Sequence, residues 1–144
     1  MVLNYPWADC GPRFRALNSS ASRTVVELSI AEDYLSKCRG FNPDLPEEQN
    51  QNAVVACGTV AAIMQATATT IEQGQEVWNQ HAPACIFTGT TDAALLEEFM
   101  GRMNPYYAIG AKWTMINESF ESFMDRVEAR QEFLERVPDG PMFG

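Results

Sequence analysis

The sequence predicts an all-α fold, an irregular bundle of about four helices with an extended arm at each end. Apolar residues recur every three or four positions over long stretches, which is the spacing of one face of a helix. Prolines and turn-forming clusters lie mainly between these stretches, and 144 residues suit a single domain. We expect a helical domain over 21–137 with helices at 23–39, 45–80, 92–103 and 111–137, flanked by arms at 1–20 and 138–144.

Turn-forming and capping residues set the boundaries of the first two helices. Two prolines, a glycine and an Asn-Ser-Ser run fall before the first helix, so this segment is expected to be irregular. Ser22 is suited to cap the first helix, and Gly40 is suited to end it. Asp44 is placed to cap the second helix, which no proline interrupts before Pro83.

The stretch AVVACGTVAAIMQATATTI, residues 53–71, carries no charge and consists mostly of small side chains. Its nineteen residues are enough to cross a bilayer. However, only three valines and two isoleucines clearly favour insertion, by about 0.3–0.6 kcal/mol each, while four threonines, a glutamine and a glycine oppose it. We therefore expect a helix that packs against another helix, and not a membrane span.

The same stretch has the spacing of a helix-packing seam. The residues at this spacing are Val54, Cys57, Ala61, Met64, Ala68, Ile71, Gln75 and Trp78, and beside them run Gly58, Ala62, Gln65 and Thr69. The last helix carries bulkier residues at the same spacing, namely Trp113, Ile116, Phe120, Phe123, Val127, Arg130, Leu134 and Val137. We expect these large side chains to fill the space beside the small ones, within one chain in preference to a neighbouring chain. On this interpretation, Ala61→Leu or Ala62→Leu overpacks the seam and lowers the melting temperature.

Apolar residues near both ends of the chain are expected to contact other subunits. A helix over 45–80 would be about 50 Å long, more than one compact domain of this size needs. The arms would then reach outward to neighbouring subunits, and the alternative is that they fold back on their own bundle. The candidate interface residues are Trp7, Phe14, Gly58, Ala61, Ala62, Met142 and Phe143.

Charge is unevenly distributed along the chain. The formal net charge is −9, and residues 41–101 contain eight acidic residues but no Lys or Arg. Because phosphate recognition depends on clustered Lys and Arg, we do not expect nucleic acid as the main ligand. A soluble acidic surface explains this block, and the alternative is a patch that docks on a basic partner.

The sequence contains no familiar reactive motif. It has no nucleophile elbow, phosphate-binding loop, dinucleotide fingerprint or HExxH motif, and its four cysteines form no CxxC pair. We expect four free thiols in a reducing compartment, with disulfide pairing left open. The single histidine, His81, is expected to cap the end of the second helix. We expect no catalytic residue, metal or cofactor.

Two neighbouring segments carry a short recognisable pattern. VELSIAEDYLSKCRGF (26–41) contains Ala-Glu-Asp-Tyr and ends near Arg-Gly, and LPEEQNQNAVV (45–55) begins a helix after Leu-Pro. This pattern resembles the small helical head-to-tail connector proteins of tailed phages, in which one helix ends near Arg-Gly and the next begins after Leu-Pro. The resemblance implies a helical component of a virion.

Together these features predict a non-enzymatic structural subunit of a larger protein assembly, with a virion component as the specific case. Its partners would be copies of itself or other subunits. No signal peptide is recognised, so we expect the cytoplasm or a virion as its location. The alternatives are an acidic binding or inhibitor protein that docks on a basic partner, and a small helical enzyme without a recognisable motif.

Overall fold

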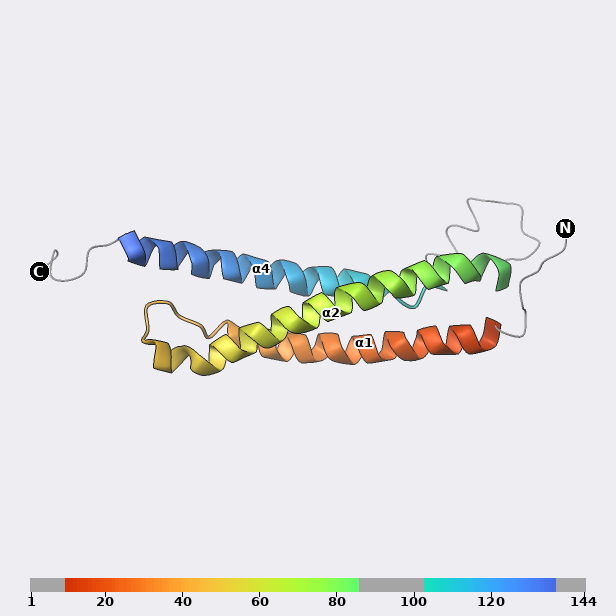
Figure 1. The fold of residues 1–144 in the computed structure, drawn as a ribbon, viewed down its shortest axis with the longest axis horizontal. Helices are drawn as coiled ribbons and strands as arrows, with labels where there is room; N and C mark the ends of the chain where they lie inside the picture. Colours follow the sequence, from red (N-terminus) through yellow and green to blue (C-terminus); the bar gives the residue numbers. More distant parts are fainter. Residues whose placement is uncertain (1–9, 86–102, 137–144) are drawn as a thin grey trace, which may run out of the picture.

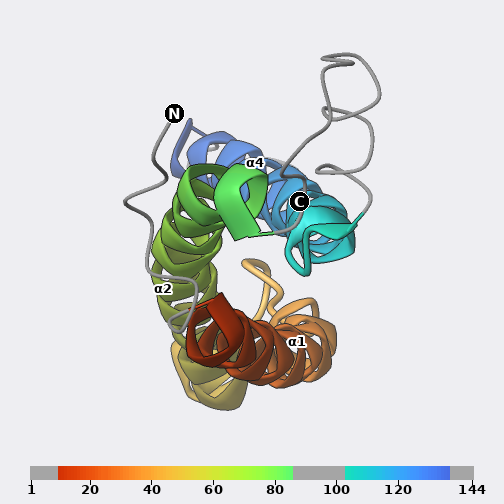
Figure 2. The same ribbon diagram turned by 90° about the vertical axis from the view of Figure 1, so that its right-hand side faces the viewer.

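Three long helices make up the computed structural model, which describes residues 10–85 and 103–136. They are α1 (Cys10–Cys38), α2 (Glu47–Cys85) and α4 (Tyr107–Arg136). α1 and α4 run in one direction and α2 in the other, and the end-on view shows the three helices around a shared centre (Figure 1, Figure 2). The described residues contain helices and turns but no strand, which confirms the all-α class.

The predicted count of four helices is not matched among the described residues. The helix expected at 92–103 falls almost wholly outside them, as do residues 1–9 and 138–144 of the expected arms and Val137 at the end of the last predicted helix. The last helix begins at Tyr107, four residues before its predicted start, and is described to Arg136.

The first helix begins at Cys10 and not at residue 23, so more than half of the predicted N-terminal arm is helical. Pro12 lies in the first turn, where a missing backbone N–H removes no helical hydrogen bond. Further along, Leu17 and Ala21 are buried in the core. This packing outweighs the weak helix propensity of the Asn-Ser-Ser run between them. Ser22 is therefore an exposed residue within α1 and not its cap.

Two disulfides join α1 to α2, so the expectation of four free thiols is wrong. Cys10–Cys85 connects the start of α1 to the end of α2, and Cys38–Cys57 connects the end of α1 to the second helix near its start. The paired cysteines are 75 and 19 residues apart, so only the folded helical hairpin brings them together. These bonds hold the two antiparallel helices in one register.

α2 continues beyond its predicted end at residue 80 and includes Pro83. A proline here removes one helical hydrogen bond, but the Cys10–Cys85 disulfide anchors the turn that follows. His81 therefore lies inside the helix, with its Nε2 atom 3.2 Å from Nη1 of Arg13 in α1. Desolvation, together with the charge of Arg13, lowers the pKa of His81. In its neutral form, the imidazole accepts a hydrogen bond from Arg13. His81 is therefore not the cationic helix cap that the sequence predicted.

The buried side of α2 is rotated relative to the predicted seam. Met64, Ile71 and Trp78 are buried as predicted, whereas Val54 and Ala61 are exposed. The buried side consists of Ala53, Ala56, Val60, Met64, Thr67, Ile71, Gly74, Trp78 and Ala82. Small uncharged residues surround this part of the helix on all sides, so hydrophobic spacing alone does not define which side faces the core.

The predicted seam of the last helix agrees with the structure from Trp113 to Val127, whereas Arg130 is exposed and Val137 lies outside the described residues. Ile116, Phe123 and Val127 are buried, and Trp113 and Phe120 are partly buried against them. The indole Nε1 of Trp113 also donates a hydrogen bond to the backbone oxygen of Met64 in α2, at 2.9 Å. α4 is thus attached to the hairpin by bulky side chains, but these do not cover the small residues Gly58, Ala61 and Ala62, which are exposed.

Tyr106 fastens the start of α4 to both other helices. Its side chain is fully buried, and its hydroxyl donates a hydrogen bond to Ser20 Oγ of α1 at 2.6 Å. Its ring lies directly against Gly74 of α2, where an added Cβ atom would overlap the ring. The side-chain oxygen of Asn104 accepts a hydrogen bond from the backbone N–H of Tyr106 and so fixes the turn that enters α4. The missing side chain at Gly74 makes room for this ring.

We expect Gly74→Ala to lower the free energy of unfolding by about 1–3 kcal/mol, because the new methyl group overpacks the site that Tyr106 fills. Gly58→Ala is the matched control, since a Cβ atom there meets nothing within 4 Å. The control should raise the free energy of unfolding by up to about 1 kcal/mol, because alanine favours a helix more than glycine does. Guanidinium denaturation at low protein concentration measures both values, and equal changes in the two variants would contradict this packing.

Candidate interaction surface

The outward side of α2, opposite its buried side, is free of charge over much of its length. No acidic or basic residue occurs between Glu48 and Glu72. Val54 is 50% exposed and Val55 is 67% exposed. From Val55, exposed residues continue at three- or four-residue spacing through Gly58, Ala62, Ala66 and Thr69. We call this stripe, Val55 to Thr69, the neutral face of α2.

Two of the seven predicted interface residues, Gly58 and Ala62, belong to the neutral face, and a third, Ala61, lies beside it. Gly58, Ala61 and Ala62 are all exposed, and the latter two are neighbours in the chain. The large-into-small packing that was expected to cover them within one chain is therefore absent on this side of the helix. Leucine at position 61 or 62 would not overpack the core of a single chain, contrary to the expectation from the sequence.

The other predicted interface residues are placed differently. Phe14 is partly buried within its own chain, with its ring centroid 5.4 Å from that of Trp78. It therefore contributes to the contact between α1 and α2. Trp7, Met142 and Phe143 lie outside the described residues.

A membrane is a poor match for the neutral face, despite its composition. Within α2, the helix Glu47–Pro83 is long and apolar enough to cross a bilayer, and only 28% of its most apolar window is buried. However, the disulfides tie α2 to α1 at both ends of α1, so the two helices would have to enter together. α1 exposes Arg23, Glu27 and Asp33, and a charged residue at the centre of a bilayer costs about 2.5–3.5 kcal/mol. These charges therefore oppose insertion of the joined α1 and α2 helices into a bilayer.

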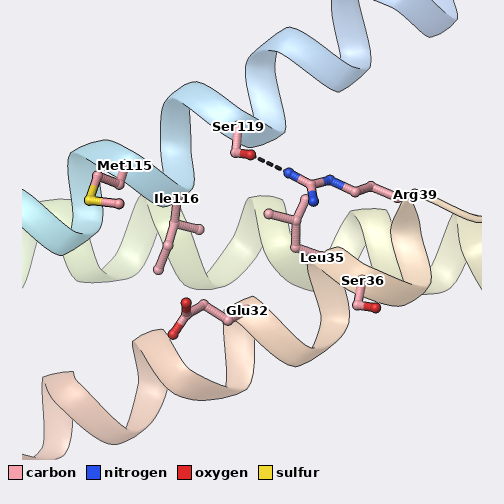
Figure 3. Close-up of a pocket in the computed structure, with 7 residues that line it drawn as sticks. All are labelled: Glu32, Leu35, Ser36, Arg39, Met115, Ile116 and Ser119. Carbon is pink, nitrogen blue, oxygen red and sulfur yellow. Dashed lines mark hydrogen bonds between the residues drawn. The ribbon is translucent and has the colours of Figure 1, made fainter.

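A cleft of about 270 Å³ separates the second half of α1 from α4 (Figure 3). At one end, Arg39 reaches from the end of α1 and donates a hydrogen bond to the hydroxyl of Ser119 on α4. Towards its other end, Glu32 of α1 forms an ion pair with Lys112 of α4, with 3.0 Å between Oε1 and Nζ. The cleft thus combines the charged side chains of Glu32 and Arg39 with an apolar floor.

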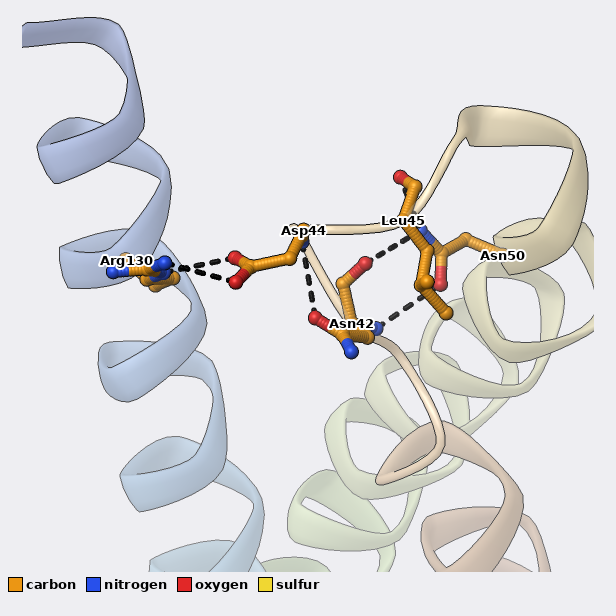
Figure 4. A network of polar contacts seen from close by, with 5 residues as sticks. All are labelled: Asn42, Asp44, Leu45, Asn50 and Arg130. Atoms are coloured by element: carbon orange, nitrogen blue, oxygen red, sulfur yellow. Dashed lines mark hydrogen bonds and ion pairs between the residues drawn. The ribbon is translucent and has the colours of Figure 1, made fainter. Parts of the chain in front are cut away.

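The turn between α1 and α2 is held by a polar network that also contacts α4 (Figure 4). The buried Asn50 side chain accepts a hydrogen bond from the Asn42 backbone N–H at 3.0 Å and donates one to the Asn42 carbonyl at 2.8 Å. Asp44 pairs with Arg130 of α4 through two contacts of 2.8 Å. α2 begins only at Glu47, so Asp44 does not cap it as predicted but links the turn to α4.

Sequence reasoning found part of the neutral face but neither of the two polar clusters. Val55 and Ala66 extend the stripe of Gly58 and Ala62 at helical spacing, and this spacing was a usable signal. The cleft and the turn network join residues about 80 positions apart, which no local pattern reveals. Within residues 10–85 and 103–136, no group of three or more His, Cys, Asp or Glu side chains is placed to hold a metal ion.

Comparison with protein-family models, with curated proteins and with solved structures found no match for this chain.

The pKa of the Asp44 carboxyl group tests the turn network. Hydrogen bonds from Arg130, and to a lesser extent its charge, hold this pKa below the ordinary value of 3.8. The pair therefore stabilises the fold above pH 3.8, and this contribution is lost as the pH falls through the lowered folded-state value. In an NMR titration we expect Arg130→Gln to return the Asp44 pKa towards 3.8. Arg126→Gln, an exposed control on the same helix, should leave it low, and equal effects of the two variants would disprove the assigned pairing.

Proposed function

We propose that the protein is a non-enzymatic structural subunit that associates with copies of itself through the neutral face of α2. The observation that carries this proposal is the exposure of the neutral face, an uncharged stripe from Val55 to Thr69 that is about 21 Å long. Exposed Val54 and Val55 add apolar area at one end of this surface. Contiguous exposed apolar surface in a folded protein commonly marks a site of protein contact.

The small side chains suit a crossed packing of two α2 helices. Gly58 and Ala66 lie one turn to either side of Ala62 on the same exposed side. Small residues at four-residue spacing allow two helix axes to approach closely. At a crossing angle of about 40–50°, the acidic ends at Glu48 and Glu72 would diverge by more than the screening length of about 8 Å. Like charges at the ends therefore do not oppose a contact centred on Ala62.

A structural role agrees with the shape of the chain. A helical hairpin with a disulfide towards each end is a stiff, elongated element, and its ends are far apart (Figure 1). Trp7, Met142 and Phe143, in the terminal segments, are proposed as additional subunit contacts. The resemblance over 26–55 to phage connector proteins supports a virion component as the specific case. The disulfides favour an oxidising environment for the assembled form, in place of the reducing compartment expected from the sequence.

Sedimentation analysis of the purified chain tests the association. We expect particles larger than the 16.1 kDa chain at micromolar concentrations. Ala62→Glu should shift them to monomer, because association would bury an unpaired carboxylate. The melting temperature of the monomer should stay nearly unchanged, since Ala62 is exposed.

The matched control is Ala129→Glu, which adds the same charge at an exposed position on α4 and should leave the association intact. A wild-type chain that stays monomeric up to a concentration of about 1 mM would contradict the proposal, because its dissociation constant for self-association would then exceed about 1 mM. Association that weakens steeply with salt would also contradict it, because that behaviour is expected for docking through acidic residues.

A further inference from the structure

We propose that the cleft between α1 and α4 binds a small carboxylate with a short apolar body. This site is independent of the neutral face, because it is formed by the second half of α1 and the middle of α4 (Figure 3). Its volume of about 270 Å³ is slightly below the range of pockets that hold drug-sized ligands, so it suits a smaller molecule.

The anion-binding group is the guanidinium of Arg39. Its side chain projects from the end of α1 across the cleft towards α4 (Figure 3). Its one hydrogen-bond partner among the described residues is the hydroxyl of Ser119, and no described carboxylate lies within 4.0 Å of it. A guanidinium carries five N–H donors in a planar fork that matches the two oxygens of a carboxylate. Arg39 therefore retains donors that a ligand can use.

The apolar part of the ligand would lie on the floor of the cleft. Leu35 of α1 lies near Arg39, Ile116 of α4 lies next along the cleft, and both are buried (Figure 3). Met115 lies farther along the cleft from Arg39, and 71% of its surface is exposed. Covering this methionine would remove apolar surface from water, which favours a ligand with a short alkyl chain over a bare anion.

The remaining charges of the cleft determine whether the ligand carries a positive or a negative charge. Glu32 lines the cleft but is already paired with Lys112 at 3.0 Å, so the two charges largely offset one another. Arg39 has no such acidic partner among the described residues. The uncompensated charge in the cleft is thus positive, and it lies at the end where the hydroxyl of Ser119 is also available.

Titration with hexanoate, followed by NMR of the backbone amides, tests this site. We expect saturable shifts confined to residues near 32–39 and 115–119. Arg39→Gln should weaken binding at least tenfold, because it removes both the charge and the fork. Arg39→Lys, which keeps the charge but loses the fork, should give a smaller loss. Arg23→Gln is the matched control, since it removes one exposed charge from the same helix about 24 Å away and should change affinity less than twofold.

Two further probes separate the parts of the ligand. Hexanol lacks the carboxylate, and inorganic phosphate lacks the apolar body, so both should bind more weakly than hexanoate. The proposal is overturned if hexanoate causes no saturable shift, if hexanol binds as tightly, or if Arg39→Gln and Arg23→Gln weaken binding equally. Guanidinium denaturation of each variant confirms that it remains folded, and a loss of binding in an unfolded Arg39→Gln chain leaves Arg39→Lys as the deciding variant.

Discussion

The pairing of α1 with α2 by two disulfides is the constraint on which the rest of the structure depends. From Cys10 to Cys38 the chain advances 28 residues along α1, and from Cys85 to Cys57 it goes back 28 residues along α2. The equal spacing means that both bonds impose the same antiparallel register. A slide of one helix along the other would break both bonds, so the core face of α2 is fixed relative to α1. α4 packs against this disulfide-linked pair.

This constraint explains both where α4 packs and which side of α2 stays exposed. With the register fixed, Gly74 meets the ring of Tyr106, which in turn reaches Ser20 of α1. These contacts bury one side of α2. The opposite side, centred on Ala62, is exposed among the described residues and carries no charge that would favour exposure to water. The neutral face is thus a consequence of how the hairpin is assembled, and it is the basis of the proposed subunit contact.

The sequence predicted what depends on local spacing and missed what depends on distant contacts. Helical periodicity was sufficient for the all-α class and for the buried residues Ile116 and Phe123 of the last helix. The start of α1 was missed because the burial of Leu17 outweighs poor local propensity there. Four cysteines allow three full pairings, and spacing cannot select among them. Among the candidate site residues, Gly58 was identified from the helical spacing of small side chains. Arg39 was missed because its partner, Ser119, lies 80 residues away in the sequence.

A disulfide map of the non-reduced protein tests the disulfide-linked pairing of α1 with α2 most directly. Proteolysis followed by mass spectrometry should yield one linked peptide pair containing Cys10 and Cys85 and another containing Cys38 and Cys57. Cys10 and Cys38 stand about 42 Å apart along one helix and cannot bond while α1 is intact. Four free thiols, or links between Cys10 and Cys38 and between Cys57 and Cys85, would contradict this pairing of the two helices and the exposed neutral face that follows from it.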